Sequence, residues 1–317
     1  MALVHEILGF GPQPADATTR DVVLGYVHDL FGRAIPPDVT DDRLGKRWAN
    51  DIVTDRSYRI AVALDESGSP MALVERWTTD SGISRVEVLI DPSLTLHQVS
   101  SGGGQLLEQL LHKTRTRADD NVATIARSEL WARPDTPAST DLANRISAQP
   151  SRELHQMQAP ASQLALSGPD TSTGYTDADL SDVIRLNNLA FADHPDQAGM
   201  TPERFHAEAS QPWFTPAGLR LWRHDGQLVA FCWTKIHTVP PVGEIYVVAV
   251  APDAQGQGFG RLVTSAGIAW MAAQGNDRIM LYVEADNTAA VTVYSRLGFT
   301  TVRTDKAWTF DEAKETI

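Results

Sequence analysis

The chain has 317 residues, with 27 lysines and arginines against 40 aspartates and glutamates, so its formal net charge is −13. This acidic balance, without a basic stripe, excludes duplex DNA and an anionic membrane surface as main partners, because both attract cationic surfaces. It favours a neutral or cationic substrate, and the length is typical of two domains.

A few features narrow the class of protein further. The single cysteine, Cys232, excludes an intramolecular disulfide and is expected to be a small buried residue. The N-terminal stretch "MALVHEILGF" is too short and too acidic for a signal peptide. No apolar run approaches the roughly 18 residues of a membrane helix, so we expect a soluble cytoplasmic protein.

The N-terminal half shows a faint alternation of strands and a helix. The predicted strands lie at 58–77 (a strand pair around a glycine turn), 84–92, 129–134 and 151–158. The stretch 100–115 is interpreted as a glycine loop and the helix that follows it. Residues 158–174 are rich in Pro, Ser, Gly and Thr, which is typical of a linker. We therefore expect an N-terminal domain at 1–160, a linker at 161–172 and a C-terminal domain at 173–317.

The C-terminal half repeats this order more clearly. The predicted elements are a helix at 177–191, a hairpin at 219–237 around Asp225-Gly226, a strand at 243–252, a helix after the next glycines, a strand at 278–285, a short helix at 287–298 and a strand at 301–310. The helix after the glycines is expected to bury Leu262, Ala266, Ala269, Trp270 and Ala273, and to end at Gly275. Such alternation predicts an α/β layer fold, here in two tandem copies with a degenerate first copy.

Three glycines, Gly256, Gly258 and Gly260, separate the strand ending in "VAVAP" from its helix. Amides at a helix N-terminus attract anions, and glycine allows a ligand to approach the backbone closely. The stretch therefore predicts a phosphate or pyrophosphate cradle, assisted by Arg261. It lacks the Lys-Ser/Thr of a P-loop and the spacing of a dinucleotide loop, and a purely structural glycine loop is the alternative.

The pattern Gln255-x-x-Gly258-x-Gly260 resembles the acetyl-CoA signature of the GNAT superfamily of N-acetyltransferases. A second signature follows it: Asn287, Ala290 and Tyr294 on one helical face, before Gly298-Phe299. The resemblance implies two tandem GNAT-type domains, each a mixed, mostly antiparallel sheet flanked by helices, with acetyl-CoA as co-substrate and a splayed strand edge at Val248–Val250. The residues that it implies for acetyl-CoA binding are Val248, Ala249, Val250, Gln255, Gly256, Gln257, Gly258, Phe259, Gly260, Arg261, Asn287 and Ala290.

Longer stretches, "LNNLAFADHPDQ", "FCWTKIH" and "LYVEADNTAAVTVYSRLGFTT", resemble the mycothiol synthase family, the tandem acetyltransferases of actinobacteria. This resemblance covers most of the C-terminal half and extends weakly into the other half. It implies acetyl transfer to a small-molecule amine, the cysteinyl amine of cysteinyl-glucosaminyl-inositol. We expect the protein to be a monomer. The glycines Gly102–Gly104 do not fit the acetyl-CoA spacing, so the N-terminal half is expected to be structural, and its binding of acetyl-CoA stays open.

An amine must lose a proton before it attacks a thioester, and the leaving thiolate needs one. The resemblance implies Glu244 as the base and Tyr294 as the acid. It also implies contacts with the acceptor from Asp196, Lys235, Glu244 and Tyr282, although the family usually has glutamate at position 196.

Each of these residues has a structural alternative. Glu244 would be an exposed strand-end residue, Tyr294 and Tyr282 packed aromatics, Lys235 a snorkelling side chain, Asp196 a loop cap and Asn287 a helix N-cap. His194 and His237 are interpreted as polar loop or strand-end residues, and no metal site is expected. Two other functions remain open: an acetyltransferase acting on another amine or a protein terminus, and a non-catalytic CoA-binding module.

Overall fold

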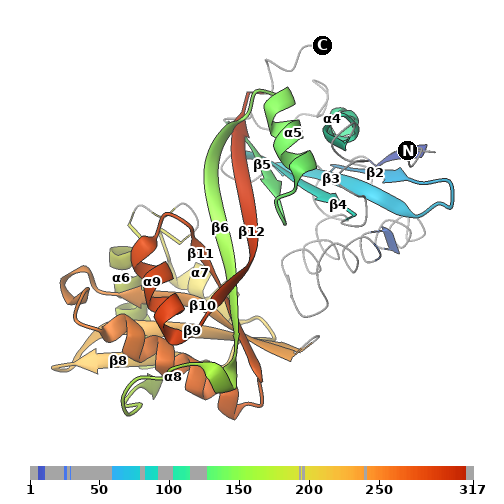
Figure 1. Cartoon of the computed structure of the whole chain (residues 1–317). Coiled ribbons are helices and arrows are strands. Elements are labelled where there is room, and N and C mark those ends of the chain that lie inside the picture. Colours follow the sequence, from blue (N-terminus) through green and yellow to red (C-terminus); the bar gives the residue numbers. More distant parts are fainter. Residues whose placement is uncertain are drawn as a thin grey trace. The chain divides into compact units, whose positions relative to one another are not determined.

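The computed structural model describes residues 6–10, 25–26, 29, 59–78, 83–91, 103–114, 127–192, 194, 197–238 and 241–311. The chain forms two compact units, Met1–Leu154 with Thr304–Ile317, and His155–Arg303. It passes from one unit to the other within two long strands, β6 (Gln149–Pro160) and β12 (Thr300–Phe310) (Figure 1). Residues 161–172, expected as a linker, therefore lie within the second unit.

The first unit is a mixed sheet with helices on one face. Its strands follow the order β1-β2-β3-β4-β5-β12. Their bounds are β1 Glu6–Phe10, β2 Arg59–Leu64, β3 Pro70–Thr78, β4 Ile83–Ile90 and β5 Arg127–Ala132. Strands β4 and β5 are parallel, whereas β5 and β12 are antiparallel. Helices α4 (Gly103–Lys113) and α5 (Pro137–Arg145) are labelled in Figure 1. Their buried apolar residues belong to the same core as those of this sheet.

The second unit is also a mixed sheet, with the order β12-β6-β11-β10-β9-β8-β7. The bounds of its remaining strands are β7 Thr173–Gly174, β8 Leu219–His224, β9 Gln227–Thr238, β10 Pro241–Val250 and β11 Arg278–Glu284. The two-residue turn between β8 and β9 places Asp225 at φ 49° and Gly226 at φ 78°. Two positive φ values are what a tight hairpin turn requires, so the predicted hairpin is confirmed.

Helices cover both faces of the second sheet. Helices α8 (Phe259–Ala273) and α9 (Thr288–Leu297) pack on one face, over Cys232 and Leu281. Helices α6 (Leu180–Ala190) and α7 (Pro202–Ala209) pack on the other face, over Phe231 and Trp233. Figure 1 shows α8 and α9 in front of the strands and the fainter α6 and α7 behind them. The side chains of each strand therefore alternate between two separate cores.

Helix α8 buries part of the face that the sequence suggested: Ala266 is buried, and Leu262 and Trp270 pack partly buried against the same core. The buried face also includes Val263, Gly267 and Met271, whereas Ala273 is exposed. A Cβ on Gly267 would lie 2.5 Å from the Cys232 Sγ, so glycine is what brings the helix this close to β9. Cys232 is fully buried, as predicted, and burial raises the pKa of its thiol to about 12.

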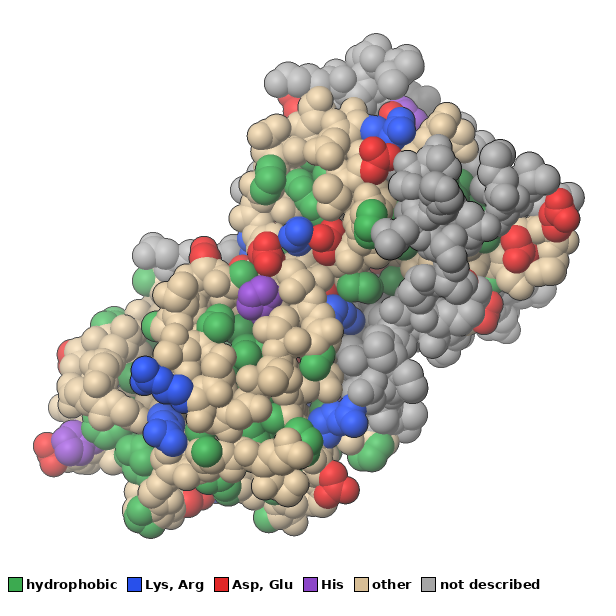
Figure 2. Space-filling model, viewed as in Figure 1, with side chains coloured by type: hydrophobic (Ala, Val, Ile, Leu, Met, Phe, Trp, Pro, Cys, Tyr) green, Lys and Arg blue, Asp and Glu red, His purple; other side chains and the backbone are tan. Residues whose placement is uncertain are grey.

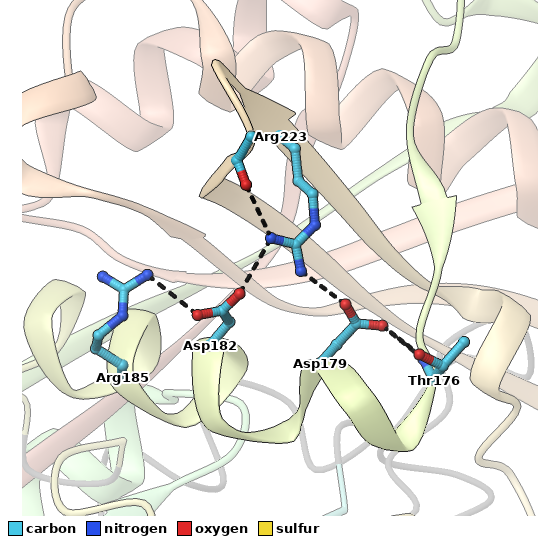
Figure 3. Close-up of polar contacts among 6 residues, drawn as sticks. Thr176, Asp179, Asp182, Arg185 and Arg223 are labelled. Carbon is cyan, nitrogen blue, oxygen red and sulfur yellow. Dashed lines mark hydrogen bonds and ion pairs between the residues drawn. The ribbon is translucent and has the colours of Figure 1, made fainter.

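An ion-pair network fastens the start of α6 to the β8–β9 hairpin (Figure 3). The guanidinium of Arg223 donates to Asp179 Oδ1 at 2.7 Å, to Asp182 Oδ2 at 3.0 Å and to the Gly226 carbonyl at 3.3 Å. Burial works to raise the pKa of Asp179, but hydrogen bonds from Thr176 and Arg223 outweigh it and lower that pKa. The network therefore favours the ionised form of the Asp179 carboxylate.

The surface is mixed in character. On the face shown in Figure 2, the acidic, basic and hydrophobic side chains of the described residues are interspersed. No helix in the described part of the chain is long and apolar enough to cross a membrane. Within the same residues, no cluster of three or more His, Cys, Asp or Glu side chains could hold a metal ion.

Candidate active site

The two parallel strands at the centre of the second sheet are paired over only part of their length. The ladder between β10 and β11 runs from Gly243 opposite Ile279 to Ile245 opposite Leu281. Strand β10 nevertheless continues to Val250, and β11 to Glu284. The register between β10 and β9 shifts at the same place, between Ile245 and Val247, so a bulge at Tyr246 bends β10 where its ladder to β11 stops.

This separation leaves one backbone edge of β10 facing β11 without a ladder. On their other side, Val248 and Val250 pair with Cys232 and Ala230 of β9. An extended ligand with amide groups can add to such an edge as an extra strand. The geometry therefore agrees with the splayed edge expected at Val248–Val250.

The glycine loop lies between the end of β10 and the first turn of α8. Gly256 has φ 76° and Gly258 φ 90°, values that side-chain-bearing residues rarely adopt. A Cβ at either glycine would meet no atom within 4 Å, so glycine is required here by the backbone conformation and not by crowding. Gly258 is the N-cap of α8, whose first turn has no acidic residue and no side-chain cap. The uncapped N-terminal amides and the helix dipole suit an anionic group.

On the α6–α7 face, Glu244 is the centre of a buried polar cluster. It lies directly opposite Lys235 in the β9–β10 ladder, and the Lys235 Nζ is 3.9 Å from its Oε2. The His237 Nε2 is 2.7 Å from the same oxygen. All three residues are at least nine-tenths buried, which excludes the interpretation of Glu244 as an exposed strand-end residue.

Aromatic side chains surround Lys235. Its ammonium lies 5.3 Å from the ring centroid of Trp213 and 5.9 Å from that of Tyr246. The ring centroids of Trp213 and Tyr246 are 5.2 Å apart, and the two ring planes are steeply inclined to each other. The Tyr246 hydroxyl donates to Glu208 Oε2 at 3.4 Å. Cation–π contacts and the carboxylate therefore hold the ammonium of a lysine that burial would otherwise disfavour.

Tyr294 belongs to the opposite face of the sheet. It lies on α9 within the core under α8 and α9. Its ring packs edge-on against that of Phe299, with 6.1 Å between the two ring centroids. Burial raises the pKa of its hydroxyl well above the ordinary value of 10.0, so the group stays protonated at neutral pH. Asn287 is the N-cap of α9, with its Oδ1 accepting from the Ala290 amide at 3.1 Å.

The structure brings only some of the expected acceptor-binding residues together. Tyr282 on β11 alternates with Leu281 and Val283, which pack under α8 and α9, so its side chain points to the same face as Glu244 and Lys235. Asp196 lies outside the described residues.

The two histidines interpreted as polar loop or strand-end residues, His194 and His237, differ in their contacts. His194 accepts from the Gln197 amide at 3.1 Å, as expected of a polar loop residue. His237 is at a strand end as expected, but its contact with Glu244 was missed. The spacing of His237 and Glu244 in the sequence does not reveal the register of β9 against β10, which places the two side chains in contact.

Comparisons with known proteins show the family and the fold of this chain. A model of the acetyltransferase (GNAT) family matches residues 182–299. A mycothiol acetyltransferase of Mycolicibacterium paratuberculosis is 40% identical over 306 residues, which cover 89% of this chain and 92% of that protein. A mycothiol acetyltransferase of Streptomyces avermitilis is 41% identical over 190 residues, 58% of this chain. There the chain spans 62% of the relative's length.

Solved structures show the same fold at low sequence identity. A GCN5-related N-acetyltransferase from Sphaerobacter thermophilus has a TM-score of 0.67 at 16% identity, covering 96% of this chain and 95% of that one. A tandem GNAT protein from the clavulanic acid biosynthesis pathway has a TM-score of 0.59 at 15% identity, covering 96% and 98%. The predicted tandem GNAT fold is thereby confirmed. With 40% identity over nearly the whole of a relative, the chain belongs to the family of mycothiol acetyltransferases.

Proposed function

We propose that this protein transfers the acetyl group of acetyl-CoA to the cysteinyl amine of cysteinyl-glucosaminyl-inositol, the last step of mycothiol biosynthesis. The observation that carries this proposal is the position of Glu244. It is buried, faces Lys235, and precedes by one residue the point where the β10–β11 ladder ends. A proton acceptor thus stands beside an opening that suits an extended, amide-containing ligand.

The described residues fit acetyl-CoA as a co-substrate. Gly256, Gly258 and the N-terminus of α8 would hold its pyrophosphate through backbone amides, with Arg261 beside them. The edge of Val248–Val250 would pair with the amides of its pantetheine arm. Asn287 already caps α9 through its oxygen, which leaves its amide nitrogen for the CoA arm. Acetyl-CoA supplies the acetyl group as a thioester.

The chemistry needs two proton transfers. Glu244 accepts the proton that the acceptor amine loses as the new N–C bond forms. Tyr294, kept protonated by burial, donates to the thiolate released when the C–S bond breaks. Lys235 and Tyr282 would hold the acceptor on the α6–α7 side, and Asp196 remains a candidate for a further contact with it.

We assign catalysis to the second unit. In the first unit the ladder between the parallel strands β4 and β5 continues without a shift from Ile83 opposite Arg127 to Val88 opposite Ala132. The strand separation that supports the proposal in the second unit thus has no counterpart over these six pairs. The loop that follows β4 lies outside the described residues.

The proposal is tested with purified protein, acetyl-CoA and cysteinyl-glucosaminyl-inositol, with the product read by mass spectrometry. Glucosaminyl-inositol and free cysteine serve as control acceptors. We expect an acetylated product from the full acceptor alone. Equal acetylation of the controls, or no product although calorimetry shows acetyl-CoA binding, would contradict the assigned acceptor. We also propose a cytoplasmic monomer, which light scattering on a sizing column tests for the oligomeric state.

A further inference from the structure

His237 contacts Glu244 in a way that the roles assigned so far do not use. The two side chains come from neighbouring strands, β9 and β10, and point to the same face of the sheet. The 2.7 Å separation between Nε2 and Oε2 is that of a short, charge-assisted hydrogen bond. His237 is 3% exposed and Glu244 8%, so water does not screen this bond strongly.

The contacts of Glu244 are divided unequally between its two oxygens. Both His237 and Lys235 approach Oε2. Among the described residues, no hydrogen bond or ion pair is made to Oε1. One oxygen is thus anchored by the protein, and the other is left for the group that loses a proton.

The direction of the bond follows from the chemistry of the partners. An ionised carboxylate has acceptors only, so the imidazole must carry its hydrogen on Nε2. We propose that His237 is a positioning residue for catalysis: its Nε2–H fixes the Glu244 carboxylate through Oε2, so that Oε1 is presented as the proton acceptor for the substrate amine. This inference rests on the proposed role of Glu244 as the base.

Substitutions at His237 can separate this role from a merely structural one. His237→Gln places an amide N–H group at the position of Nε2. His237→Asn places its amide N–H group nearer to the position of Nδ1, and His237→Leu removes the donor altogether. Loss of alignment by about 1 Å can cost about 10²-fold in rate. We expect kcat to fall by about that factor in the Leu and Asn variants and to recover largely in the Gln variant, with the KM for acetyl-CoA unchanged in all three.

The matched control is His112→Leu, which replaces an exposed histidine on α4 in the first unit. It should leave kcat and KM unchanged. Thermal unfolding of each variant separates loss of positioning from loss of fold. Equal kcat in the Gln, Asn and Leu variants, all folded, would overturn the inference.

A second measurement does not depend on the acceptor. In protein with 15N-labelled histidine, the His237 signal, assigned by its absence in His237→Gln, should report the Nε2–H tautomer in a strong hydrogen bond. It should move when Glu244 is replaced by leucine. A wild-type protein without turnover would contradict the proposed function, and an Nδ1–H tautomer would separately overturn the role of His237.

Discussion

Glu244 and Tyr294 lie on opposite faces of one sheet. Glu244 is on the α6–α7 side with Lys235, whereas Tyr294 lies in the core under α8 and α9. A base and an acid that serve one reaction must both reach the reacting atoms. The place where the ladder between β10 and β11 stops, just after Glu244, is where the sheet allows this. In the proposed mechanism, the unpaired stretch therefore serves the proton transfers as well as the binding of acetyl-CoA.

Glu244→Gln removes the proposed proton acceptor but keeps the size of the side chain. We expect kcat to fall by about 10²–10⁴-fold, the usual contribution of a positioned general base. The affinity for acetyl-CoA should stay the same, because the glycine loop and the β10 edge are intact. Steady-state kinetics and calorimetry check the two statements, and unchanged turnover would remove Glu244 from the mechanism.

Tyr294→Phe should slow the reaction without abolishing it. The proton donor is lost, but water can protonate the thiolate, so we expect a fall in kcat of about 10²-fold or less. Because burial raises the pKa of Tyr294, the wild-type rate should not decline through loss of this proton between about pH 7 and 9. A pH–rate profile identical for both proteins, with equal rates, would rule out the role as acid.

The glycine loop can be tested with a pair of alanine substitutions. Gly258 has φ 90°, and Gly68, in a turn of the first unit, has φ 81°; neither Cβ would meet an atom within 4 Å. Both substitutions should cost about 1–2 kcal/mol in the free energy of unfolding from left-handed strain. Only Gly258→Ala should raise the KM for acetyl-CoA. An equal rise for Gly68→Ala would mean that strain, and not the loop, sets the affinity.

Gly267→Ala should destabilise the second unit by overpacking. The added Cβ would lie 2.5 Å from Cys232 Sγ and 3.2 Å from Thr234 Cγ2, and such crowding costs about 1–3 kcal/mol. In a Cys232→Ala background the sulfur is gone, so Gly267→Ala should cost less. Denaturant unfolding of the wild type, the two single variants and the double variant gives the coupling energy between the two positions. If the two costs are additive, the added Cβ is not accommodated at the expense of the Cys232 sulfur, and the prediction is wrong.

The pair between Arg223 and Asp179 should stabilise the protein only while the carboxylate is ionised. Its depressed pKa means that the stabilisation is fully present above the ordinary value of 3.8 and is lost as pH falls through the lower native value. Arg223→Met should therefore lower the free energy of unfolding by up to about 1 kcal/mol at neutral pH, and by less in acid.

A suitable comparison is Arg185→Met, because Arg185 is half exposed and lies 3.5 Å from Asp182. Its effect should be smaller at every pH. Urea unfolding across the acid range measures both variants, and a difference that grows as the pH falls would contradict the assigned sign.

Local patterns predicted much of the second unit correctly. The Asp225-Gly226 turn, the strand before the glycines and helix α8 follow from signals within a few residues, and all three occur. The buried face of α8 was predicted only in part: Ala266 is buried, but Ala273 is exposed, and the burial of Gly267 was not predicted. At Gly267 the missing side chain is what allows the contact with Cys232.

The features that the sequence did not predict depend on pairing between residues that are far apart in the chain or on strand register. The strand at 301–310 was predicted as an element, but nothing in its sequence indicates that Lys306–Phe310 pair with β5 of the first unit. His237 was likewise misjudged, because its partner depends on the register of two strands and on a bulge at Tyr246. Such registers are set by packing across the whole sheet.

The passage of β12 into the first unit has a consequence for how the protein is made. The second unit is a continuous stretch, His155–Arg303, whereas the first unit needs Thr304–Phe310 to complete its sheet. On the ribosome, the N-terminal residues emerge first but must wait for a strand that is translated after all of the second unit. The later-synthesised unit can therefore be the first to finish folding, and the earlier one closes only when its last strand arrives.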